Sequence, residues 1–228
     1  MAMLAEHGVD AKAASYYARQ GWLVRLGHGV YAVPGDEISS HAAARLLQRQ
    51  VEGLHVGGKS ALALHGVRHN LSVRDTLVLW ANVRFTIPKW FSARFPARAV
   101  FAGLFDWPNE TLPRRTITTP PDALAGLRVS VPERAALEML HEVGTHETLE
   151  DSPNTFEGLR NLRTEVAGEL LSCCTSVKAV RLFLLWSRET GLMDVDALRE
   201  QFPLRVGSDS RWVSRLPDGT LLSLNPYG

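Results

Sequence analysis

The chain has 228 residues, of which 45% are hydrophobic and 21% charged, and its formal net charge is +1. This composition is that of a globular protein whose length allows a sizeable core, so neither a metal nor a disulfide is needed to hold the fold. The nearly neutral balance excludes an overall basic protein. A nucleic-acid surface must therefore come from locally clustered Lys and Arg side chains.

The sequence also predicts the cellular compartment of the protein. Its two cysteines, Cys173 and Cys174, are adjacent, and we interpret both as reduced thiols, which fits a reducing compartment. The first residues, MAMLAEHGVD, lack the basic segment and apolar run of a secretory signal. No apolar run approaches the roughly 18 residues that span a bilayer. We therefore expect a cytoplasmic protein.

The first 36 residues have the order of a winged helix-turn-helix. A short helix over residues 4–8 is followed by a glycine turn, and Asp10 suits the N-cap of a second helix, DAKAASYYARQ. WLVRL and VYAV, joined by GHG, predict a two-stranded wing. A complete winged domain normally has another helix before this pair, so we expect this one to lack its first helix. The break PGD ends the domain, which predicts domains at 1–36 and 37–228.

The second helix carries one polar face that suits the major groove of DNA. Four side chains recur at the spacing i, i+3, i+4 and i+7, which places them on one side of a helix. The wing adds two more side chains that can contact phosphate. The alternative is a solvated helix and hairpin without a ligand. The predicted DNA-binding residues are Lys12, Ser15, Tyr16, Arg19, Arg25 and His28.

The remaining chain mixes helical and strand patterns, so the predicted fold class is α+β, with a small winged helix-turn-helix followed by a larger mixed α/β domain. Pro132 suits the first turn of a helix, and PDG suits the turn of a hairpin near the C-terminus. Helices are expected at 41–50, 59–67, 132–143 and through most of 155–192, and strands at 54–56, 75–81, 84–88, 98–105, 127–131, 211–216 and 220–224.

The stretch GLHVGGKS, Gly53 to Ser60, matches the phosphate-loop pattern at every fixed position. A phosphate loop follows a buried strand and opens a helix. Here the stretch follows a helical segment, and its strand-like residues, 54–56, lie inside the would-be loop. A strand-to-helix turn is therefore the favoured interpretation, and a P-loop nucleotide-binding protein is the alternative.

Three longer segments of the sequence indicate a protein family. GWLVRLGHGVYAVPGD, GLHVGGKSALALHGVRHNL and VSVPERAALEML closely resemble AbiEi-family antitoxins, which are abortive-infection (phage-defence) proteins of type IV toxin–antitoxin systems. The resemblance implies an N-terminal winged helix that represses the antitoxin–toxin operon through inverted repeats in operator DNA. It implies a C-terminal domain that neutralises a nucleotidyltransferase-like toxin. Carried onto this chain, the repressor role falls on the six DNA-binding residues predicted above.

Residues 84–115 form a second basic segment, in which aromatic side chains alternate with Lys and Arg. Basic residues and aromatics together can bind RNA or single strands by phosphate pairing and stacking. An RNA-binding module is therefore a further alternative, against aromatics that are simply core. The candidate nucleic-acid or toxin surface consists of Arg84, Lys89, Arg94 and Arg98.

The sequence gives little support to catalysis or metal binding. The pair His65 and His69 has helical spacing but no third ligand nearby, and His141 and His146 lie in a loop-like stretch. No G-x-S-x-G elbow or paired-carboxylate motif occurs, and Cys173 has no evident activating base. We therefore expect no enzyme, no cofactor and no metal site.

Overall fold

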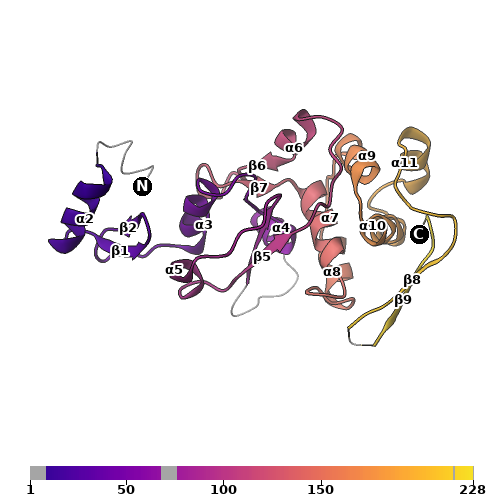
Figure 1. The fold of residues 1–228 in the computed structure, drawn as a ribbon. Helices are drawn as coiled ribbons and strands as arrows, with labels where there is room; N and C mark the ends of the chain where they lie inside the picture. The colour runs from indigo at the N-terminus through magenta and orange to yellow at the C-terminus, as the bar shows by residue number, and fades with distance from the viewer. Residues whose placement is uncertain (1–8, 68–75, 218, 228) are drawn as a thin grey trace.

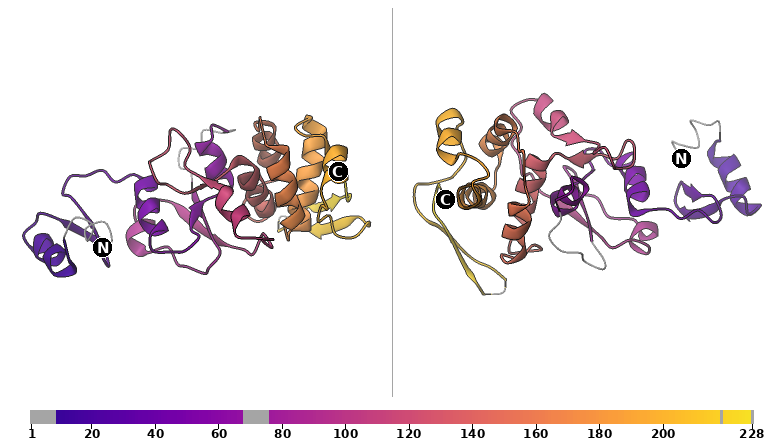
Figure 2. Two further views of the ribbon diagram at one scale, coloured as in Figure 1. Left: turned by 90° about the horizontal axis from the view of Figure 1, so that it is seen from above. Right: turned by 180° about the vertical axis from the view of Figure 1, so that it is seen from behind.

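The computed structural model describes residues 9–67, 76–217 and 219–227. The molecule is elongated, with residues 11–32 at one end, a mixed sheet in the middle and residues 195–224 at the other end (Figures 1 and 2). The short helix expected at residues 4–8 lies outside the described residues. In the described part of the chain, no helix is long and apolar enough to cross a membrane.

The predicted second helix and wing are confirmed. Helix α2 (Ala11–Arg19) begins after Asp10, whose side chain accepts a hydrogen bond from the backbone N–H of Ala13 at 2.7 Å. The helix gives way to Gly21, whose φ of +76° suits a residue without Cβ. The antiparallel strands β1 (Val24–Gly27) and β2 (Val30–Ala32) then form the wing.

The wing packs against the second part of the chain through Gly27. A Cβ atom at this glycine would collide with the indole ring of Trp90, which lies in α5 (Lys89–Ser92). Val30 on β2 is buried and belongs to the same continuous core as Trp90. The absence of a side chain at Gly27 therefore lets the wing approach α5 closely.

Replacing Gly27 with alanine is expected to destabilise the protein by about 1–3 kcal/mol, because the added methyl overpacks a filled contact. The φ of Gly27 is not in the left-handed region, so the effect reports the contact with Trp90 and not backbone strain. Gly103→Ala is the matched control, since a Cβ there meets nothing within 4 Å and its φ is also ordinary. Equal urea midpoints for the two variants would contradict the contact.

The central sheet has five strands in the order β5-β4-β3-β7-β6. Parallel pairing joins β4 to β5 and β3 to β7, while β3–β4 and β6–β7 are antiparallel. All five residues of β4 are buried, as expected for a strand inside a sheet. The strands are β3 (His55–Val56), β4 (Leu77–Ala81), β5 (Ala97–Phe101), β6 (Ile117–Thr118) and β7 (Val129–Ser130).

Helices surround this sheet and extend the core away from it. Helix α7 packs against α4 and α10, so it joins the sheet to the C-terminal helices (Figure 1). Residues 33–39 connect the wing to α3 without helix or strand. The helices are α3 (Ser40–Gln48), α4 (Gly58–Leu64), α6 (Thr111–Arg115), α7 (Pro132–Glu142), α8 (Asp151–Glu157), α9 (Thr164–Cys173), α10 (Val177–Thr190) and α11 (Val195–Gln201).

The structure confirms the α+β class and most of the predicted elements. The C-terminal hairpin is present as β8 (Trp212–Arg215) and β9 (Leu221–Leu224). The strand predicted at 84–88 is wrong: residues 84–88 form neither helix nor strand, and Pro88 is the N-cap of α5. The sequence missed α5, α6, α11 and β6, which are seven residues or shorter.

Candidate nucleic-acid interface

The polar face predicted on α2 points to solvent. Lys12, Ser15, Tyr16 and Arg19 are all exposed, whereas Ala14, on the opposite side, is completely buried. Arg19 lies in the last turn of the helix, where a cation interacts favourably with the helix dipole. The helix therefore presents a stripe of two cations, a hydroxyl and a phenol over its whole length.

The wing lies beside this stripe. Arg25 is the cross-strand partner of Tyr31, so the two side chains share one face of the hairpin. The hydroxyl of Tyr31 lies 3.5 Å from Oγ of Ser15, which joins that face to the stripe on α2. Arg25 and His28 are both exposed. Sequence reasoning missed Tyr31, because its place beside Ser15 depends on the register of the wing.

The aromatic and basic side chains of segment 84–115 do not form one exposed surface. Trp90 and Phe91 are core residues, 8% and 0% exposed. Of the four candidate cations, Lys89 is exposed, and Arg84 lies over the ring of Phe101 at 5.2 Å. Arg94 is also exposed and donates to the carbonyl of Trp90, whereas Arg98 is only partly exposed and is paired with Glu142 and Glu147.

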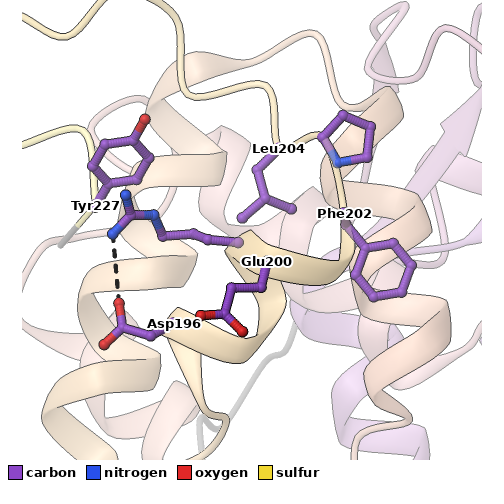
Figure 3. A pocket seen from close by; sticks show the side chains of 7 residues that line it. Asp196, Glu200, Phe202, Leu204 and Tyr227 are labelled. Atoms are coloured by element: carbon purple, nitrogen blue, oxygen red, sulfur yellow. Dashed lines mark hydrogen bonds and ion pairs between the residues drawn. The ribbon is translucent and has the colours of Figure 1, made fainter.

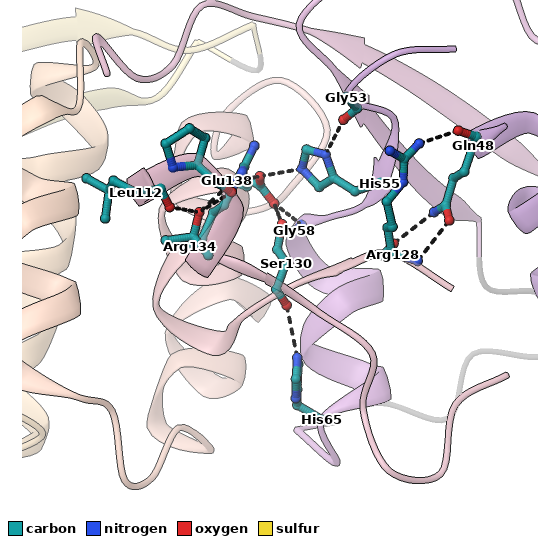
Figure 4. A network of polar contacts seen from close by, with 12 residues as sticks. Gln48, Gly53, His55, Gly58, His65, Leu112, Arg128, Ser130, Arg134 and Glu138 are labelled. Carbon is teal, nitrogen blue, oxygen red and sulfur yellow. Dashed lines mark hydrogen bonds and ion pairs between the residues drawn. The ribbon is translucent and has the colours of Figure 1, made fainter. Parts of the chain in front are cut away.

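The stretch that matches a phosphate loop surrounds a carboxylate of the same chain (Figure 4). The backbone N–H of Gly58 donates to Oε2 of Glu138 at 3.0 Å, and Ser130 donates to the same oxygen at 2.8 Å. The other oxygen, Oε1, lies 2.9 Å from Nε2 of His55 and accepts from Arg134 at 2.8 Å. The place of a phosphate is thus taken by the side chain of Glu138.

The glycines and lysine of this stretch fit the same interpretation. A Cβ atom on Gly57 would collide with Glu138 and with the ring of Trp80. Lys59, which would reach the terminal phosphates in a phosphate loop, lies 3.5 Å from the carboxylate of Glu147. The pattern therefore reflects the turn from β3 into α4 packed around Glu138, as the favoured interpretation expected.

Glu138 stays ionised although it is completely buried. Burial alone acts to raise the pKa of this carboxyl, but the positive charges of His55 and Arg134 and the donated hydrogen bonds lower it to about 2. Burial and the charge of Arg134 lower the pKa of His55, and Glu138 opposes them. Nδ1 of His55 lies 2.8 Å from the carbonyl of Gly53, so both ring nitrogens face acceptors.

The remaining histidines do not gather into a ligand set in the described residues, where no three His, Cys, Asp or Glu side chains could hold a metal ion together. Nε2 of His65 lies 2.9 Å from the carbonyl of Ser130, and His69 lies outside the described residues. Burial and the nearby Lys178 lower the pKa of His141. Its loop partner in the sequence interpretation, His146, is exposed.

The two cysteines are free and buried. Burial raises the pKa of Cys173 to about 11 and that of Cys174 to about 12. Both side chains are therefore neutral thiols at physiological pH, and a neutral thiol is a poor nucleophile.

A cavity of about 490 Å³ opens beside α11 (Figure 3), and α11 lies at the other end of the molecule from α2 (Figure 1). Phe202 and Leu204 supply apolar surface, and Asp196 and Glu200 supply negative charge. The guanidinium of Arg199 stands over the ring of Tyr227 at 3.6 Å. None of the residues predicted as functional from the sequence lines this cavity.

Comparison with known proteins identifies the family. A model described as the AbiEi antitoxin N-terminal domain of a transcriptional regulator matches residues 1–73, and one described as a transcriptional regulator, AbiEi antitoxin, type IV TA system, matches residues 74–224. No curated protein matches. The crystal structure of the RV2827C protein from Mycobacterium tuberculosis is similar in fold, with a TM-score of 0.53 and 16% identity over 90% of this chain and 77% of that one. The chain therefore belongs to the AbiEi antitoxins, the transcriptional regulators of type IV toxin–antitoxin systems.

Proposed function

We propose that this antitoxin represses its own operon by placing α2 in the major groove of operator DNA while the wing grips the adjacent backbone. The observation that carries this proposal is the exposed stripe on α2, with Arg25 of the wing brought beside it through Tyr31. In this arrangement Lys12, Ser15, Tyr16 and Arg19 face the base edges and phosphates, and Arg25 and His28 face phosphates.

The size of the stripe predicts the arrangement of the operator. Lys12 and Arg19 are seven residues apart, or about 10 Å along a helix, which covers about three base pairs. So short a contact gives limited affinity and specificity. We therefore propose that two copies bind inverted repeats in the promoter, each copy reading one repeat.

The double substitution Lys12→Ala and Arg19→Ala is expected to weaken operator binding by at least about tenfold at physiological salt. Each lost phosphate contact also lowers the slope of log K against log salt by about one. The measurement is a titration of labelled promoter DNA at several salt concentrations.

A matched control removes the same charge elsewhere. Arg211 and Arg215 are exposed residues of the C-terminal hairpin region, at the other end of the molecule from α2 (Figure 1). Arg211→Ala with Arg215→Ala is expected to leave the affinity and the salt slope unchanged. If the α2 variant binds like this control, α2 is not the recognition helix.

We further propose, with a domain boundary after residue 36, that residues 37–228 neutralise a nucleotidyltransferase-like toxin in the cytoplasm without a catalytic step by the antitoxin. The exposed Arg84, Lys89 and Arg94 on this part of the chain belong to the proposed toxin or nucleic-acid surface, to which Arg98 contributes from a less accessible position. The α2 double variant tests this separation of roles. Co-expressed with the toxin, it should still rescue growth although it no longer represses the promoter.

A further inference from the structure

Trp22 is an unusually exposed aromatic residue directly after the recognition helix. Tryptophan is highly buried on average in folded proteins, yet 65% of the surface of Trp22 is exposed. Its position is nevertheless fixed. Its backbone N–H donates to the carbonyl of Tyr17 at 2.9 Å, and its ring stacks on the ring of Tyr17 with centroids 5.5 Å apart and planes at 24°.

The exposed indole is continuous with the stripe on α2. Tyr17 makes an edge contact with Tyr16, with ring centroids 5.9 Å apart and planes at 61°. Tyr16 is itself 50% exposed and belongs to the stripe. The three rings thus form a row that runs from the stripe to the chain segment after the C-terminal end of the helix. The row ends in a flat, uncharged surface held in one orientation.

We propose that Trp22 is a further DNA-contacting residue, which packs its indole against a deoxyribose of the duplex beyond the end of α2. This inference rests on the proposed function, because the cations of the stripe bring the DNA to this surface. Lys12, Arg19 and Arg25 attract the phosphates, and the indole then offers the apolar surface against which a deoxyribose can pack. Because its partner Tyr17 already orders the ring, little side-chain freedom is lost on binding.

The salt dependence of binding separates this contact from a phosphate contact. Trp22→Ala is expected to weaken binding to DNA with a single repeat by about tenfold, because an apolar contact that the indole buries is lost. The slope of log K against log salt should stay unchanged, since no counterion-releasing contact is lost. Trp22→Phe, which keeps a flat ring, should recover most of the affinity. Single-repeat DNA is used so that contacts between two antitoxin copies cannot contribute.

Two controls make the result decisive. Val213→Ala removes another exposed apolar side chain, 51% exposed, from the C-terminal hairpin, and should leave binding unchanged. Thermal melts should show that Trp22→Ala is folded at the binding temperature. Unchanged single-repeat binding for Trp22→Ala, or a loss seen only with two repeats, would overturn the proposal, the latter pointing to a contact between copies. The role of α2 would survive either outcome, because the Lys12 and Arg19 variant tests it separately.

Discussion

Replacing Glu138 with glutamine is expected to lower the free energy of unfolding by about 3–5 kcal/mol, the cost of breaking a buried ion pair by removing one partner. The substitution keeps the size of the side chain, so it leaves no cavity. It leaves the guanidinium of Arg134, 6% exposed, without its carboxylate. It also puts an amide N–H₂ where Glu138 now offers an oxygen to two donors.

Urea denaturation of the two proteins measures this loss. Glu110→Gln is the matched control, because Glu110 forms an i, i+4 ion pair with Arg114 whose side chains are 91% and 81% exposed. Exposed pairs contribute little, so this control should change the unfolding free energy by less than about 0.5 kcal/mol. Similar losses for the two variants would show that the network around Glu138 does not stabilise the fold.

The pH dependence of stability gives a second readout of the same network. The pKa of Glu138 lies at about 2 in the folded protein, below the ordinary value of 4.5. A lowered carboxyl pKa means that the unfolded chain takes up the proton more readily. The stabilisation is therefore complete above about pH 4.5 and is lost as the pH falls towards 2, by about 3 kcal/mol in all. The wild-type protein should lose this increment on acidification and Glu138→Gln should not.

The elements that the sequence predicted correctly have local causes. Helix α2 has an Asp10 cap and a glycine after its end, and α7 has Pro132 in its first turn. Gly219, with a φ of +88°, lies between the two strands of the C-terminal hairpin. Each of these signals acts within a few residues of the chain. The stripe on α2 was predictable for the same reason, because helical spacing alone decides which side chains share a face.

The network around Glu138 could not be predicted, because its causes are not local. His55 and Glu138 are 83 positions apart, and Gly58 and Glu138 are 80 apart. The phosphate-loop pattern nevertheless corresponds to a real structural feature. It marks a turn whose glycines let an anion approach the backbone closely. Only the fold shows that the anion is a carboxylate of α7 and not a nucleotide.

The short elements were missed for a different reason. Helix α5 has four residues and β6 has two, so neither is long enough to repeat its apolar spacing. Yet α5 contains Trp90, against which Gly27 of the wing packs. The surface proposed to bind DNA thus depends on a short helix, α5, that is stabilised by tertiary packing and that no local sequence pattern predicts.

Arg181→Met is expected to destabilise the protein by about 3–5 kcal/mol, because four backbone carbonyl groups lose their donor and two of these hydrogen bonds are buried. Arg181 on α10 is 1% exposed, and its guanidinium donates to four backbone carbonyls at 2.6–2.9 Å. Three of them belong to the segment before β8 and one to β9, the acceptors being Val206, Ser208, Ser210 and Leu224. Methionine fills much of the same volume but can donate to none of them.

The effect should be concentrated at the C-terminal end of the molecule. Arg181 is the donor that ties the segment before β8, and β9 itself, to α10, so backbone amides of the C-terminal hairpin should exchange hydrogen faster in Arg181→Met. Arg188→Met is the matched control on the same helix, because Arg188 is 45% exposed and pairs only at the surface with Asp196. Operator binding should be retained in both variants below their unfolding midpoints, since α2 and the wing lie at the other end of the chain (Figure 1). Unchanged exchange in the hairpin would mean that packing of Leu222 and Leu224, both buried, holds it without Arg181.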